Sequence, residues 1–217
     1  MRPLPHRNVF EDRGKILTKN MNKGISVYGE RLISMKGVEY RQWDPKRSKL
    51  GAAIMKKVNL PKFSEKDIWL YLGSASGTSV SHISDIALKG TIYAVEFAPR
   101  VMRDFLFMAE KRDNISPILG DAFHPERYDS RIAMVDILFQ DIAQKSQVDI
   151  FLKNMRFLKD SGTAIIAVKA RSIDVSKKPK MIFDMVRKQF QDEVKIIDSK
   201  MLEPFEEDHC VFVCKKK

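Results

Sequence analysis

The sequence of 217 residues has only two cysteines, ten glycines and no apolar stretch near the roughly 20 residues that span a membrane. Cys210 and Cys214 lie four residues apart in a predicted strand, which separates them by about 13 Å, too far for a disulfide. Neither has the spacing of metal ligands, so no metal is expected, and both thiols are interpreted as small core residues in a reducing compartment. The segment 1–10 lacks an apolar signal-peptide core, which argues against secretion.

The charge of the chain is unevenly distributed. The formal net charge is +11, and residues 1–66 contain 16 lysines and arginines against 6 acids, whereas residues 67–217 contain 23 against 22. A basic segment beside a nearly neutral domain indicates a polyanionic partner, most simply nucleic acid. General solubility charge and an acidic protein partner are the alternatives.

Short apolar segments separated by glycines predict a small antiparallel β domain in the first third of the chain. Its strands are expected near residues 9–10, 16–17, 25–28, 32–33 and 38–40. A helix over 48–57 follows, with Ser48 as its N-cap. Residues 1–57 are therefore predicted to form a basic, β-rich domain, and residues 58–217 a second, larger domain.

Strands and helices alternate in the larger domain, which predicts an α/β, Rossmann-like fold with a mostly parallel seven-stranded sheet. The strands are expected at 68–72, 91–96, 115–119, 135–140, 163–169, 194–199 and 210–213. Helices are expected near 80–88, 99–112, 148–157 and 179–190. Because the last two strands follow each other without a helix, one of them is predicted to run antiparallel at the sheet edge.

A loop of small residues, Gly-Ser-Ala-Ser-Gly-Thr at 73–78, follows the first of these strands, and Glu96 ends the second. Such a loop lets a nucleotide-type ligand approach the backbone, and an acid at the next strand end can bind both hydroxyls of a ribose. The loop lacks the complete G-x-G-x-x-G spacing of dinucleotide sites. It therefore suits S-adenosylmethionine, which has no pyrophosphate, and disfavours a nicotinamide oxidoreductase.

Polar residues follow the other strands as well, and ligands of open parallel sheets bind beyond the carboxyl ends of the strands. The residues expected to converge there are Glu96, Phe97, Asp121, Ala122, Asp141, Gln144, Lys169 and His209. Taken singly, they have structural alternatives, such as a turn cap for Asp121, a helix cap for Glu96 and a solvated strand end for Lys169. One geometry explains them together, so we expect one site.

The chemistry of methyl transfer suggests roles for two lysines. A nucleophile attacks the methyl group of a sulfonium in line, and the protein mainly has to align the two reactants. If the nucleophile is a ribose hydroxyl, Lys169 can orient it or, when neutral, accept its proton. Asp141 favours the charged form of Lys169, whereas the sulfonium and a second lysine favour the neutral form. Lys49 is the candidate second lysine, because its predicted helix is apolar enough to pack on the sheet.

Longer segments carry a resemblance to a known family between about residues 40 and 213. They are Glu39–Leu50, Tyr71–His82, Tyr93–Phe97, Gly120–Pro125, Asp141–Gln144, Val168–Ala170 and Leu202–His209. The chain resembles fibrillarin, the RNA ribose 2′-O-methyltransferase of box C/D ribonucleoproteins. Gln140 stands where a small residue is usual in the family, and it is expected to alter packing near the acceptor. His82 and His124 lie inside matched motifs and are expected to be structural hydrogen-bonding residues.

The resemblance implies guide-RNA-directed 2′-O-methylation of rRNA and tRNA, with S-adenosylmethionine as the methyl donor. It implies a catalytic set of Lys49, Asp141, Lys169 and His209. It also implies cofactor contacts from Gly73, Ser74, Ala75, Ser76, Gly77, Thr78, Glu96, Phe97, Asp121, Ala122, Asp141 and Gln144. A non-enzymatic binding module on the same fold is the alternative, and the intact Glu96, Asp141 and Lys169 argue against it.

The resemblance also implies partners and a location. The partners are a box C/D guide RNA, an rRNA or tRNA substrate, a Nop-domain scaffold protein and a kink-turn-binding ribosomal-type protein, with no membrane. Eukaryotic members carry a long Gly/Arg-rich extension, whereas this chain has 10 glycines in all. It therefore resembles the short archaeal form, for which a cytoplasmic location is expected.

Overall fold

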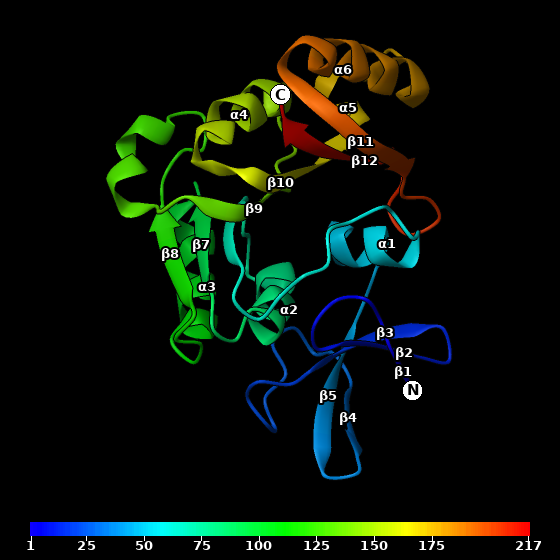
Figure 1. The fold of residues 1–217 in the computed structure, drawn as a ribbon, viewed down its shortest axis with the longest axis vertical. Coiled ribbons are helices and arrows are strands. Elements are labelled where there is room, and N and C mark those ends of the chain that lie inside the picture. The colour runs from blue at the N-terminus through cyan, green and yellow to red at the C-terminus, as the bar shows by residue number, and fades with distance from the viewer.

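A computed structural model describes residues 1–217 as two β-sheets joined by a short helix (Figure 1). The N-terminal sheet is antiparallel, and its strand order is β1 (Arg2–Pro3), β2 (Val9–Asp12), β3 (Lys15–Lys19), β5 (Val38–Trp43), β4 (Leu32–Met35). Helix α1 (Lys49–Met55) follows, and Ser48 is its N-cap, as predicted, because the Ser48 hydroxyl accepts a hydrogen bond from the Gly51 N–H.

The second sheet has seven strands in the order β11 (Val194–Met201), β12 (His209–Lys216), β10 (Leu158–Lys169), β9 (Val135–Gln140), β6 (Ile68–Leu72), β7 (Thr91–Glu96), β8 (Ile115–Leu119). The predicted α/β fold with a mostly parallel sheet is confirmed, and strands β6 to β9 have the predicted bounds. The antiparallel strand is β12, which lies one position inside the edge, between β10 and β11. Edge strand β11 follows a helix and runs in the same direction as β10. The direct connection after β11 reverses the chain, so β12 runs in the opposite direction between β11 and β10.

Helices cover both faces of the larger sheet (Figure 1). Helices α2 (Thr78–Ile86) and α3 (Pro99–Ala109) join α1 and the N-terminal sheet in one core cluster, while α4 (Gln147–Asn154) and α6 (Pro179–Glu193) belong to the other. The two faces alternate along β6, with Trp69 and Tyr71 in the first cluster and Leu70 and Leu72 in the second. Because Val9 shares a cluster with Trp69, both sheets enclose a common core. The domain boundary at residue 57 stays a prediction.

The remaining short helices differ in detail from the predicted pattern. The helix predicted over 148–157 is α4 followed by a 3-10 turn at Met155–Phe157. Helix α5 (Ala170–Ile173), which follows β10, was not predicted, because four residues are too few to show a helical period. Two further 3-10 turns lie at Pro125–Arg127 and Asp129–Arg131. No helix combines the length and apolar character needed to cross a bilayer.

The predicted strand at 25–28 is wrong, because this segment is a loop. Gly24 and Gly29 bound it with φ of +79° and +82°, values that suit turns rather than strands. The Glu30 carboxylate accepts hydrogen bonds from the N–H groups of Val27, at 2.9 Å, and Tyr28, at 2.8 Å. A side chain therefore satisfies the donors that a neighbouring strand would otherwise bind.

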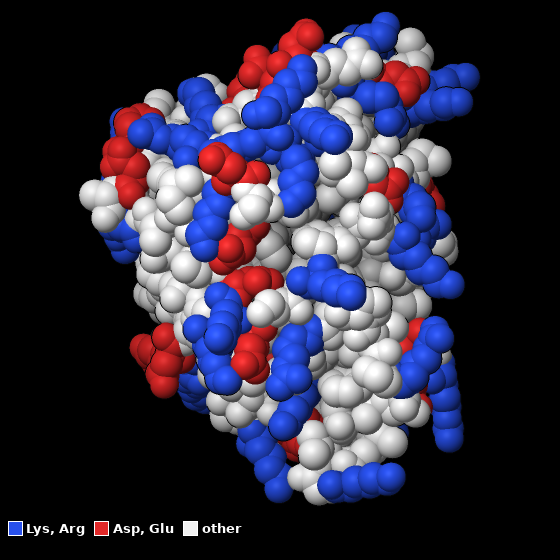
Figure 2. Space-filling model, viewed as in Figure 1, with Lys and Arg blue, Asp and Glu red and all other residues white.

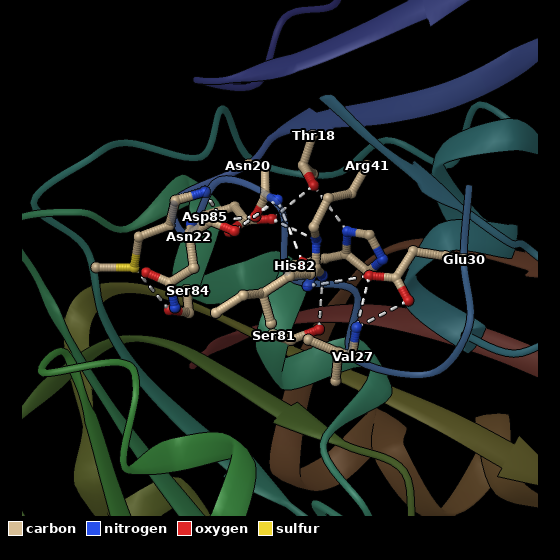
Figure 3. Close-up of polar contacts among 12 residues, drawn as sticks. Thr18, Asn20, Asn22, Val27, Glu30, Arg41, Ser81, His82, Ser84 and Asp85 are labelled. Carbon is tan, nitrogen blue, oxygen red and sulfur yellow. Dashed lines mark hydrogen bonds and ion pairs between the residues drawn. The ribbon is translucent and has the colours of Figure 1, made fainter. Parts of the chain in front are cut away.

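A buried polar cluster joins the N-terminal sheet to α2 (Figure 3). Asp85 of α2 lies 3.1 Å from Arg41 Nε and 2.8 Å from Arg112 Nη1, and all three side chains are buried. His82, one turn earlier, makes hydrogen bonds of 2.7 Å to Thr18 Oγ1 and to the Tyr28 hydroxyl. Its predicted structural role is confirmed. Burial and the two arginine charges hold the pKa of His82 well below its ordinary value.

The other residues singled out in the sequence are His124 and the two cysteines. His124 is partly exposed, and its Nδ1 lies 3.0 Å from Glu126 Oε1. Cys210 and Cys214 are both free and buried in β12, as predicted, and burial raises the pKa of each thiol to about 12. Neither thiol is therefore a reactive thiolate at neutral pH.

Candidate active site

A cavity of about 270 Å³ lies at the carboxyl ends of β6, β7, β8 and β9. Eight of the twelve residues predicted to contact the cofactor line it: Gly73, Ala75, Glu96, Phe97, Asp121, Ala122, Asp141 and Gln144. The sequence interpretation missed five further lining residues: Val95, Gly120, Ile142, Ala143 and Ile150. Val95, Gly120, Ile142 and Ala143 stand inside the recognised motifs and could have been found there, whereas Ile150 looks like an ordinary core residue in the sequence.

The cavity begins at a turn that requires glycine. Gly73 has φ of +82°, and a Cβ atom there would lie 2.5 Å from the Asp141 carbonyl oxygen. Its N–H donates to the Val95 carbonyl at 2.9 Å. The loop after β6 therefore packs directly against the end of β9. The other side of this loop is open to a ligand.

The other four predicted cofactor residues do not line this cavity. Gly77 is the N-cap of α2 with φ of +89°, and a Cβ there would overlap Met108 and Phe105 of α3. Thr78 begins α2, Ser74 is buried, and Ser76 faces a separate hollow beside Asn22. They shape the loop, and their contact with a cofactor stays a prediction.

Glu96 and Asp121 line the cavity. Each also makes the local hydrogen bonds expected of its structural alternative, a helix cap for Glu96 and a turn cap for Asp121. The Glu96 carboxylate accepts from the N–H of Ala75 and of Ala98, both at 2.9 Å, and Ala98 is the N-cap of α3. Asp121 Oδ1 accepts from the Phe123 N–H at 2.9 Å. These bonds hold the two carboxylates in one orientation at the cavity wall.

The four predicted catalytic residues lie on three strand ends and one helix start, and Asp141 belongs to both the cavity and this group. Lys49 Nζ, at the start of α1, lies 3.8 Å from Asp141 Oδ1 and 3.6 Å from Glu206 Oε1. Glu206 was not predicted as a site residue, although it stands in a recognised motif. Burial raises the pKa of Asp141, and the charges of Lys49 and Lys169 oppose that rise.

Lys169 and His209 are paired across β10 and β12. His209 Nδ1 lies 2.7 Å from the Glu207 carbonyl oxygen. The Nδ1–H therefore donates, and Nε2 keeps a lone pair. Burial lowers the pKa of His209, and the positive charges of Lys49 and Lys169 lower it further against the opposing effect of the Glu207 carbonyl. His209 is consequently a neutral base at neutral pH.

A buried glutamine pair positions Lys169. Gln147 Oε1 accepts from the Lys169 N–H at 2.9 Å, and Gln147 Nε2 donates to the Lys169 carbonyl at 3.1 Å. Gln140, which the resemblance singled out, is fully buried and donates through Nε2 to the Gln147 carbonyl at 2.6 Å. Gln140 therefore supports the residue that holds the backbone of Lys169, a predicted catalytic residue.

The lining of the cavity fits S-adenosylmethionine. Glu96, Asp121 and Asp141 provide three carboxyl groups, and no lysine or arginine lines the cavity. That charge suits a ribose and a sulfonium, and it disfavours the pyrophosphate of a dinucleotide. The ring of Phe97 is 64% exposed beside the cavity, so it offers a face to a planar base.

Comparisons with known proteins agree with this geometry. The family model described as Fibrillarin matches residues 5–217. A fibrillarin-like rRNA/tRNA 2′-O-methyltransferase from Methanosarcina barkeri is 48% identical over 96% of this chain and 94% of its own length.

Two solved structures are similar to this chain along nearly its whole length. Aeropyrum pernix fibrillarin with natively bound S-adenosyl-L-methionine has a TM-score of 0.86, 45% identity and coverage of 98% of this chain and 96% of that one. A fibrillarin/Nop5p complex has a TM-score of 0.90, 39% identity and coverage of 98% and 99%.

Proposed function

The chain belongs to the fibrillarin family, and on that premise we propose that it methylates the ribose 2′-hydroxyl of rRNA and tRNA under the direction of a box C/D guide RNA. Its methyl donor is S-adenosylmethionine. The observation that supports this function best is the position of Asp141. It lines the acidic cavity and also lies beside Lys49, so it marks the place where donor and acceptor meet.

The chain's own residues have distinct parts in the reaction. S-adenosylmethionine supplies a methyl group on a sulfonium. Glu96 and Asp121 hold the donor in the cavity, and the Gly73 turn admits it close to the backbone. Lys169 orients the ribose hydroxyl beside the cavity. The proton of that hydroxyl passes to a nitrogen at the rim, and His209 Nε2 is neutral and available to accept it.

The partners are proposed on different grounds. The fibrillarin/Nop5p complex supports a Nop-domain scaffold protein. The family supports the guide RNA and a kink-turn-binding ribosomal-type protein. Figure 2 shows lysines and arginines spread over the visible face with acids among them, so the positive charge is distributed over that face. Archaeal relatives support placing the reaction in the cytoplasm.

Reconstitution tests this function. The chain is mixed with a guide RNA, the two protein partners, a complementary target RNA and labelled methyl donor, and the modified ribose is located. We expect one labelled 2′-oxygen at the position set by guide pairing. The chain alone should be inactive or poor on free RNA, because no aromatic-rich base-reading motif is present. Donor binding without methyl transfer in the complete assembly would favour the binding-module alternative, and sequence-specific methylation by the chain alone would refute guide direction.

A further inference from the structure

We propose that Glu206 is a positioning residue of this site, which shares the ammonium group of Lys49 with Asp141; this inference rests on the proposed methyl-transfer function. Glu206 Oε1 lies 3.6 Å from Lys49 Nζ, and Asp141 Oδ1 lies 3.8 Å from the same atom. A charge-assisted hydrogen bond is shorter, about 2.7–2.9 Å. The ammonium group is therefore held between two carboxylates rather than bonded closely to either one.

Because these groups are mostly buried, the electrostatic interactions among them are strong. The side chains of Glu206 and Asp141 are 14% and 21% exposed, so water screens their charges weakly. Two lysines, Lys49 and Lys169, face these two carboxylates, and the set is balanced in charge. Burial raises the pKa of Glu206 and Asp141 raises it further, while the two lysines oppose the rise.

Sharing Lys49 has a consequence for Asp141. Without Glu206, the ammonium would have a single buried carboxylate to approach, and it would be drawn toward Asp141. With Glu206 in place, Asp141 keeps its position at the cavity wall and is not fully engaged by Lys49. Glu206 thus sets both the place of Lys49 and the charge that Asp141 presents.

The connection that carries Glu206 is fixed to the same helix as Lys49. It runs from 202 to 208 between β11 and β12, and its Leu202 is buried in the core. Lys56, the C-cap of α1, donates through Nζ to the Glu203 carbonyl at 2.8 Å. The connection therefore contacts α1 at both ends, through Glu203 and through Glu206, which holds the Glu206 carboxylate in place.

The test compares Glu206→Gln with wild type in the reconstituted complex. We expect kcat to fall about tenfold, while KM for S-adenosylmethionine changes less than about threefold, because Glu206 does not line the cavity. The acid limb of the pH profile of kcat should move to lower pH. Glu206 faces Lys49, Lys169 and Asp141, and removing its negative charge lowers the pKa of the Asp141 carboxyl.

Two further variants make the outcome decisive. Glu206→Asp keeps the charge and shortens the reach, so it should lower kcat and leave the acid limb in place. Glu193→Gln, at the exposed end of α6, should match wild type. A Glu206→Gln variant with wild-type kcat, or with lower kcat and an unmoved acid limb, overturns the positioning role. Wild-type complex that transfers no methyl group would instead refute the proposed function.

Discussion

The hydroxyl oxygens of Ser48 and Ser79 lie 2.8 Å apart in a buried position. Ser48 is the N-cap of α1 and directly precedes Lys49, whereas Ser79 is the second residue of α2 and follows the 73–78 loop. This hydrogen bond therefore fixes the helix that carries Lys49, a predicted catalytic residue, against the helix that begins at the end of the 73–78 loop.

Ser79→Ala should reduce methyl transfer several-fold, because α1 loses its tether to α2 and Lys49 moves relative to Asp141. The free energy of unfolding should fall by about 1 kcal/mol, the usual contribution of one hydrogen bond. Single-turnover rates and thermal unfolding measure the two effects. Ser79→Thr keeps the hydroxyl and should retain most of the activity, and equal rates for Ala and wild type would contradict the tether.

Lys169→Ala should abolish methyl transfer while it leaves the binding of S-adenosylmethionine intact, because Lys169 does not line the cavity. Calorimetric titration with the donor and the labelled-methyl assay measure the two properties. Lys145→Ala removes an exposed lysine near the same rim and serves as the control. Full activity of Lys169→Ala would refute the role assigned to this residue.

Gly73→Ala should destabilise the protein by about 2–4 kcal/mol and weaken donor binding, because the added Cβ meets the Asp141 carbonyl in addition to the strain of a positive φ. Gly37→Ala is the matched control. Gly37 has φ of +78° with nothing within 4 Å of the added atom, so the expected loss is only about 1 kcal/mol. Chemical unfolding measures both variants, and equal losses would show that the close approach at Gly73 has no energetic weight.

Asp85→Asn should destabilise the fold by about 3 kcal/mol or more, because it leaves the buried Arg41 and Arg112 without their shared carboxylate. The loss is measured as the change in the free energy of unfolding. Asp184→Asn on the exposed face of α6 should be nearly neutral. A small loss at Asp85 would mean that the cluster in Figure 3 contributes little to joining the N-terminal sheet to α2.

The stability of the protein should fall below pH 6.5 in part because of His6. Its ring stacks on Phe63 at a centroid distance of 4.2 Å, and burial lowers its pKa to about 4. The unfolded chain therefore binds a proton below pH 6.5 that the folded chain does not, so stability present above that pH is lost as the pH falls toward 4. At 1.36 kcal/mol per pKa unit the loss reaches about 3 kcal/mol.

His6→Phe keeps an aromatic ring beside Phe63 and removes this titration. Unfolding by denaturant across the pH range should show wild type losing more stability than the variant below pH 6.5. Parallel pH dependence of the two proteins would contradict the low pKa of His6.

Much of the larger sheet could be read from local sequence. Strands β6 to β9 are short apolar runs bounded by turn residues, so their bounds follow from neighbouring side chains. The strand expected at 25–28 failed because Glu30, a residue outside it, supplies the acceptor for its N–H groups. The inner position of β12 was equally hidden, because strand order depends on how connections cross the sheet.

The features of the candidate site also divide into those that the sequence determined and those that only the tertiary structure decided. The sequence alone determined the residue types of the cofactor loop, the acids at the strand ends and the family, since these depend on motif and spacing. Tertiary structure alone decided that Glu206 meets Lys49, that Gln140 supports the residue clamping Lys169, and that Ser74, Ser76, Gly77 and Thr78 do not line the cavity. The contact of Lys49 with Glu206 joins segments far apart in the chain, and only the packing of the core brings the two residues within reach.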